Sequence, residues 1–335
     1  MTRPASGHGL LVGILDPASL VARDVTAVLE ERGFPVAKKK LFHTSGKAEG
    51  LFAEDDDEAA FVAPATPDAL EGCAIAFACG SPASTRKFLR SRAPGDGCLL
   101  VDLSGADPAS PLADGRGALP EGNLVRLPDP TAWLLAELVR FLDEAAPPAR
   151  VAALTVAVDR PVSELGRAAL DELFAQSVAL AAFGPMPKET LGGQAAFNCV
   201  HPPDSSEWEA RVGIDAERLF LGRVDLSLFS ARSGVFHGHH LRIEASFAEG
   251  APPPLDAVRA ALLAAGSGFE EADPEGLCGP VEAAGRDETL VLRLEEGRGR
   301  LRIALASDSL RRPAAVLAVR LAEEAVFTRG LLPDA

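Results

Sequence analysis

Short apolar runs alternate with helical segments in the N-terminal part of the chain, and this alternation constrains the fold more than any other feature. The first run, Leu10–Leu15, predicts a buried parallel strand. A segment with apolar residues at helical spacing follows, and Gly33 ends it while Pro35 prevents its return. Three more runs predict strands of the same kind: Val36–Phe42, Ala74–Cys79 and Cys98–Leu103. Strands that alternate with helices indicate a doubly wound, Rossmann-like parallel sheet of the α/β class.

The pattern changes beyond about residue 150, where the predicted strands become longer. They are Val151–Val158, Val224–Ser230, Val235–Phe247, Thr289–Glu295 and Arg300–Ala306. Side chains alternate in the last of them, and Glu296–Gly299 predicts a hairpin turn before it. We therefore expect an α+β half with a mostly antiparallel sheet, on which a long helix near Val162–Ala182 packs. A final helix, Pro313–Phe327, is expected to pack on the first half, and the acidic stretch Glu49–Ala60 to be a solvated loop.

Composition excludes several functional classes. The net charge of −15 repels the phosphate backbone, so no nucleic acid partner is expected. No apolar run approaches the ~20 residues of a membrane span. The first apolar run is also too short for a secretory signal, so we expect a cytoplasmic protein. The five cysteines are odd in number and include no Cys-x-x-Cys pair, which disfavours both a disulfide framework and a zinc ribbon.

The predicted strand Val235–Phe247 carries the side chains best suited to chemistry. Alternation places His239 on its covered face and His240 on its solvent face. His239 follows Gly238, which leaves room for a close approach, and can be a general acid/base, a metal ligand or a packed core histidine. No matching carboxylate or Cys/His pair accompanies it, so no metal site is predicted. Arg232 would form a carboxylate pocket beside His239 if a bulge or turn at Ser233-Gly234 brought the two together, and is otherwise a surface arginine.

Five segments, taken in chain order, resemble motifs of the aspartate-semialdehyde dehydrogenase family. They are the helix end Val28–Pro35, Gln194–Asn198 (family "IAFN"), Val235–His239 ("VFRGH"), Val281–Gly285 ("LEAAG") and Ser307–Arg312 ("SDNLRKG"). The resemblance implies a Rossmann-like, NAD(P)-binding-type domain at 1–127 that a C-terminal helix within 313–335 rejoins. It also implies a dimerisation and catalytic-type domain at 128–312, a homodimer, and NADP as the cofactor.

The family's reaction is the reversible reductive dephosphorylation of aspartyl phosphate through a cysteine thioester. The resemblance places the family's acid/base on His239 and its carboxylate-binding arginine on Arg232, and both residue types are present. The nucleophile's turn, "NPNCST" in the family, is Leu127–Ala132 here, so Pro130 stands at the cysteine position. The active-site glutamine falls on Arg160. This turn is similar to "VPDSLTS" of the family's cysteine-lacking, Usg-like paralogues.

The nucleotide-binding segment differs from the family as well. The family loop "GATGAVG" is Asp16–Ala22 here, and it contains no glycine. Glycines at such positions allow backbone N–H groups to approach phosphates, whereas Asp16 adds a like charge and Pro17 lacks an N–H. The positions that the resemblance assigns to the cofactor are Asp16, Ser19 and Ala22 in this degenerate loop, and Gly80 and Ser81 after a later strand.

These changes predict a catalytically silent homologue with a binding or scaffolding role and no NADP. Two alternatives stay open. One is an enzyme with altered chemistry on a small carboxylate, using His239 and Arg232, and the other is a residual NADP-dependent semialdehyde dehydrogenase. We also expect Arg160 to pair with Asp129 or Asp159 and so close the former active site.

Overall fold

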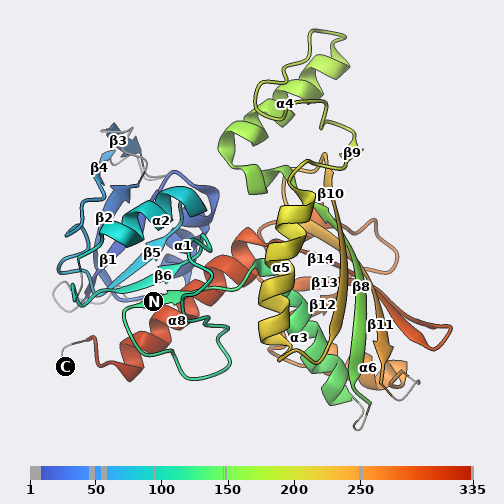
Figure 1. The fold of residues 1–335 in the computed structure, drawn as a ribbon. Helices are drawn as coiled ribbons and strands as arrows, with labels where there is room; N and C mark the ends of the chain where they lie inside the picture. Colours follow the sequence, from blue (N-terminus) through green and yellow to red (C-terminus); the bar gives the residue numbers. More distant parts are fainter. Residues whose placement is uncertain are drawn as a thin grey trace. The chain divides into compact units, whose positions relative to one another are not determined.

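The computed structural model describes residues 9–44, 50–53, 59–93, 95–145, 147, 149–248 and 252–332. The chain forms two compact units, one made of Met1–Pro128 with Ala314–Ala335 and the other of Asp129–Pro313 (Figure 1). Each unit is built on one seven-stranded sheet. Within the described ranges, no helix is both long and apolar enough to cross a membrane.

The first unit is Rossmann-like, and its sheet has the strand order β3-β4-β2-β1-β5-β6-β7. Neighbouring strands are parallel, except that β3 forms an antiparallel edge with β4. The strands are β1 Leu10–Leu15, β2 Val36–His43, β3 Gly50–Ala53, β4 Ala59–Pro64, β5 Ile75–Ala78, β6 Leu99–Asp102 and β7 Leu124–Arg126. The helices are α1 Leu20–Glu31, α2 Pro82–Ser91 and α8 Val316–Thr328, and α8 contacts α1. The predicted parallel sheet of the α/β class is confirmed.

Two boundaries predicted in this unit are wrong. Residues 50–53 and 59–60, expected to be part of a solvated loop, belong to strands β3 and β4, while residues 54–58 lie outside the described part. The acidic residues between them obscured two short segments that pair at the edge of the sheet. The last helix begins at Val316 rather than Pro313, because the backbone at Arg312 is extended (φ −125°, ψ 128°) and kinks the chain just before this helix.

The second unit has the strand order β12-β13-β14-β11-β8-β10-β9. The strands are β8 Val151–Arg160, β9 Cys199–Val200, β10 Asp225–Ser233, β11 His239–Phe247, β12 Phe269–Glu271, β13 Thr289–Gly297 and β14 Arg300–Ser307. The β8–β10 and β12–β13 pairs are parallel and the other four are antiparallel, which confirms the predicted mostly antiparallel sheet.

The helices of the second unit lie mainly on one face of its sheet (Figure 1). They are α3 Pro130–Ala145, η1 Val162–Leu165, α4 Arg167–Ala181, α5 Ser205–Leu219, α6 Leu255–Leu262 and α7 Pro280–Ala283. Helix α3 contacts α5, α6 and β8, and these elements enclose an apolar core. The long helix expected near Val162–Ala182 is instead two pieces, η1 and α4, and α4 stands away from the sheet. Glu172 and Gln176 are buried, and their side chains form hydrogen bonds with backbone groups of the loop of residues 187–196. These bonds attach α4 to the loop.

The segment Val235–Phe247 is not one continuous strand. The strand β11 begins only at His239, because the carbonyls of Val235 and Phe236 accept hydrogen bonds from the N–H groups of Val162 and Ser163 in η1, at 2.9 and 3.0 Å. Within β11 the predicted alternation is confirmed, since His239 is buried and His240 is partly exposed. This connection brings η1 against the start of β11, next to the candidate site.

Candidate functional site

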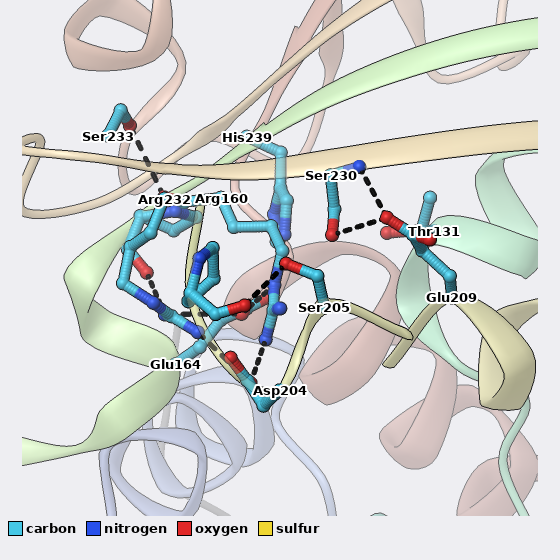
Figure 2. A network of polar contacts seen from close by, with 12 residues as sticks. Thr131, Arg160, Glu164, Asp204, Ser205, Glu209, Ser230, Arg232, Ser233 and His239 are labelled. Carbon is cyan, nitrogen blue, oxygen red and sulfur yellow. Dashed lines mark hydrogen bonds and ion pairs between the residues drawn. The ribbon is translucent and has the colours of Figure 1, made fainter. Parts of the chain in front are cut away.

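Three of the four residues that the sequence singled out in the second unit, Arg160, Arg232 and His239, converge at one end of its sheet, although they lie on three different strands. Strand β8 runs between β10 and β11, and its last residue, Arg160, pairs in register with Arg232 of β10. On the other side, β11 begins at His239, and His240 pairs with Asp159. The sheet order therefore brings Arg232 and His239 to the same region, and the chain between their strands bends at Gly234, where a bulge or turn was expected (Figure 2).

A largely buried carboxylate, Glu164 of η1, joins these three residues. Its Oε1 lies 2.7 Å from His239 Nε2, and its Oε2 lies 2.7 Å from Arg160 Nε and 3.6 Å from Arg232 Nη1. Glu164 was not among the candidate residues from the sequence. The signal that could have found it is its position four residues after Arg160, at the start of a helical turn.

A second carboxylate, Asp204, contacts the same two arginines from the end of the loop before α5. Its Oδ2 accepts hydrogen bonds from Arg160 Nη2 at 3.2 Å and from Arg232 Nη2 at 3.3 Å. Figure 2 shows both guanidinium groups reaching toward Asp204 and Glu164. Arg160 also stacks on Trp208 of α5, with its Cζ 4.5 Å from the ring centroid.

The electrostatics of the cluster favour a charged Glu164. Burial alone would raise the pKa of this carboxyl, but the hydrogen bond and charge of His239, together with Arg160 and Arg232, lower its pKa to about 2. Burial and the neighbouring charge of Arg160 lower the pKa of Arg232, against the opposing effect of the two carboxylates. The cluster thus contains two buried guanidinium groups, Arg160 and Arg232, whose positive charges require carboxylates beside them.

The ion pair expected for Arg160 is wrong. Arg160 pairs with Glu164 and Asp204 instead of Asp129 or Asp159. Asp159 precedes it on β8 and therefore points to the other face of the sheet, where it pairs with Arg242 at 2.9 Å. Asp129 lies 3.8 Å from Arg211.

The turn that would carry the nucleophile is a regular helix start. Pro130 is the first residue of α3, where proline is well tolerated. The Asp129 carboxylate before it accepts a hydrogen bond from the N–H of Thr131 at 2.9 Å, and its own N–H donates to Asp215 at 2.8 Å. Burial raises the pKa of Asp129, only partly opposed by Arg211. The position assigned to the cysteine therefore offers neither a thiol nor a hydroxyl.

The cysteines of the first unit do not replace the lost nucleophile. Cys73, Cys79 and Cys98 are buried, and burial raises the pKa of each thiol. Because the thiolate is the nucleophilic form, these side chains are unreactive packed groups. In the second unit, Cys199 is exposed on β9 and Cys278 is partly exposed.

The loop after β1 does not fit a dinucleotide phosphate. Asp16 has a φ of 58°, and its carboxylate accepts hydrogen bonds from the N–H (2.8 Å) and the hydroxyl of Thr44. A Cβ added at Gly80 would lie 1.9 Å from Asp16 Oδ2, so this carboxylate lies directly over Gly80. An approaching phosphate would therefore meet a negative charge where the family motif has open backbone.

The helices α1 and α2 beside this loop are each capped at the N-terminus by a serine side chain of the chain itself. Ser19 accepts a hydrogen bond from the N–H of Ala22 at 3.2 Å, and Ser81 accepts one from Ser84 at 3.2 Å. Ser81 is thus the N-cap of α2, which accounts for the Gly-Ser signal in the sequence without a nucleotide. As for metals, no group of three or more His, Cys, Asp or Glu suited to an ion occurs among the described residues.

Known proteins share both the sequence pattern and the architecture of this chain. No protein-family model matches the chain. It is similar to a USG-1 protein homologue of Azotobacter vinelandii, with 29% identity covering 93% of this chain and 96% of that protein. It is also similar to the aspartate-semialdehyde dehydrogenase of Prochlorococcus marinus, with 27% identity covering 96% and 98%. The solved structure of a probable aspartate-semialdehyde dehydrogenase from Pseudomonas aeruginosa superposes with a TM-score of 0.81 at 25% identity, covering 96% of this chain and 99% of that one. Over nearly its whole length the chain is thus similar in sequence and fold to aspartate-semialdehyde dehydrogenases and to their USG-1 homologues.

Proposed function

We propose that this chain is a catalytically silent member of its family with a binding or scaffolding role in the cytoplasm. The observation that carries the proposal is Pro130 at the start of α3, in the position of the family's cysteine. Covalent catalysis needs a nucleophile there, and proline has none. Mixing the protein with aspartate semialdehyde, NADP and phosphate tests this, and no NADPH formation above the enzyme-free rate is expected.

The arrangement around Glu164 supports the same conclusion. In the family, the counterparts of Arg232 and His239 act on the substrate; here both contact a carboxylate of the chain itself. Their convergence also favours the second candidate function, altered chemistry on a small carboxylate. For that chemistry, a ligand would have to compete with the protein's own carboxylates for the same cations.

We propose that the protein does not hold NADP in the manner of its family, because the Asp16 carboxylate covers Gly80. In isothermal titration calorimetry, wild-type protein should give no saturable heat with NADP at concentrations up to about 1 mM, which corresponds to a binding free energy weaker than about 4 kcal/mol. Asp16→Gly removes the charge and keeps a residue suited to positive φ, so any gain of binding in this variant identifies Asp16 as the obstacle. Micromolar binding by the wild type would contradict the proposal.

We propose that the protein is a homodimer that uses the exposed side of α4. Phe174 and Val178 of this helix are exposed, as are Phe183 and Phe197 in the segment that follows it. Exposed apolar side chains gathered on one element mark an interaction surface. The hydrogen bonds of Gln176 to residues 187–196 hold this segment in place without a partner.

Sedimentation velocity tests the dimer. Wild-type protein should sediment as a dimer at micromolar concentration, and the double variant Phe174→Glu, Val178→Glu should sediment as a monomer because two charges would be buried at the interface. The control is Phe327→Glu, which charges an even more exposed apolar position on α8 and should leave the dimer intact. A monomeric wild type, or a control that dissociates as fully as the double variant, would overturn the proposal.

A further inference from the structure

Two like charges are buried side by side in the second unit. The side chains of Arg160 and Arg232 are only 4% and 5% exposed, and both contact the same oxygen of Asp204 and the same oxygen of Glu164. Two guanidinium groups that contact the same carboxylate oxygens repel each other. They stay together because the negatively charged carboxylates attract both. The pair is therefore an anion site, and the chain supplies both of its anions.

The two carboxylates differ in how firmly they are held. Glu164 is 18% exposed, and His239 and Arg160 each hold it at 2.7 Å. Asp204 is 45% exposed, and its contacts with the two arginines are longer, at 3.2 and 3.3 Å. Short charge-assisted hydrogen bonds are the stronger ones, so Asp204 is the occupant that can leave.

The position of Asp204 in the chain supports this assignment. It is the N-cap residue of α5, where an aspartate ordinarily accepts hydrogen bonds from the first turn. Its side chain makes no such bond within the described chain, and it turns to the two arginines instead. If it left them, the first turn of α5 is where an N-cap aspartate ordinarily finds its N–H partners.

Arg160 also has a hydrogen-bond donor that is not used within the described residues. Arg160 Nη1 is buried and has no hydrogen-bond acceptor in the part of the chain that the structure describes. Trp208 covers the face of this guanidinium, so its edge is left for anions. One monodentate oxygen of Asp204 serves two guanidinium groups, whereas a free carboxylate could offer both of its oxygens.

We propose that Asp204 is a displaceable internal carboxylate that closes a two-arginine anion site, and that the carboxylate group of a small ligand takes its place. One monoanion replaces another, so the charge of the buried cluster is unchanged by the exchange. The inference deepens the proposed binding role and rests on it. It makes Asp204 the competitor that a small carboxylate must displace from Arg160 and Arg232.

The test uses acetate as the probe and thermal unfolding as the readout, with sodium chloride added to keep the ionic strength constant. Asp204→Ala should lower the Tm, and acetate should raise the Tm of this variant along a saturable curve. The wild type should respond less, because its own Asp204 competes. The control is Asp159→Ala, which removes a carboxylate paired with the 56% exposed Arg242, and which should show no saturable response to acetate.

A second set of variants keeps the test decisive. If Asp204→Ala does not fold, Asp204→Asn removes the charge at nearly constant volume and should show the same gain with acetate. Adding Arg160→Gln to either variant should abolish the gain. Equal acetate responses in the wild type, the Asp204 variants and the Asp159 control would overturn the proposal. Loss of the acetate effect leaves the absence of turnover untouched, and observed turnover leaves the acetate effect untouched, so the two failures are distinguishable.

Discussion

Glu164→Gln should lower the free energy of unfolding at neutral pH by about 3 kcal/mol. The pKa of Glu164 is lowered from 4.5 to about 2, and this difference corresponds to about 3 kcal/mol of interaction with the charged form. Removing the charge leaves Arg160 and Arg232 buried with only the more exposed Asp204 beside them. Urea unfolding monitored by circular dichroism measures the difference.

The pH dependence gives an independent check. A carboxyl whose pKa is lowered on folding stabilises the native state fully above its unfolded pKa, and that stability is lost as the pH falls toward the folded pKa. The gap between wild type and Glu164→Gln should therefore be constant above about pH 5 and shrink as the pH falls from about 4.5 toward 2. The control Asp159→Asn breaks a pair with exposed Arg242 and should change stability by no more than about 1 kcal/mol. A Glu164→Gln effect no larger than this control would show that the cluster is not held by Glu164.

Gly238→Ala should also lower the free energy of unfolding by about 3 kcal/mol, because two penalties combine at this position. Gly238 has a φ of 86°, where a side chain adds roughly 1–2 kcal/mol of strain. A Cβ there would also lie 2.5 Å from the carbonyl oxygen of Pro280, and such overpacking typically adds 1–3 kcal/mol. What approaches this glycine is thus the backbone of α7, rather than a ligand.

Gly285→Ala separates the two penalties. Gly285 has a φ of 75°, and a Cβ there would meet no atom within 4 Å in the described chain. This variant should therefore show the strain alone, a loss of roughly 1–2 kcal/mol. Equal losses for the two variants would mean that the contact with Pro280 yields easily. Since His239 follows Gly238 directly, Gly238→Ala should in addition weaken the response of stability to pH that Glu164 produces.

The sequence could predict the parts of the fold that depend on local pattern. The parallel strands β1, β5 and β6 are buried on both faces and therefore appear as apolar runs, and β11 shows the alternation of a strand with one covered face. The Pro130 substitution and the loss of glycines in the Asp16 loop were visible by comparing residue types alone. These features required no knowledge of which strands are neighbours.

The polar cluster could not be predicted because it depends on strand order and on two connecting segments. Arg232 and His239 come together only because β8 lies between their strands. Glu164 and Asp204 enter from η1 and from the start of α5, where the local sequence shows no periodicity that points to the sheet. Consequently the ion pair expected for Arg160 was wrong, because its partners come from these two connecting segments.

A turnover assay tests directly whether this chain catalyses the reaction of aspartate-semialdehyde dehydrogenases, which we propose it does not. NADPH formation is followed by absorbance with aspartate semialdehyde, NADP and phosphate, beside an active aspartate-semialdehyde dehydrogenase as positive control. The account predicts a rate equal to the enzyme-free background, at any protein concentration, since Pro130 supplies no nucleophile. A rate that rises in proportion to the concentration of this protein would contradict it. Loss of that rate in the Cys199→Ala, Cys278→Ala double variant would then assign the nucleophile to one of these two cysteines.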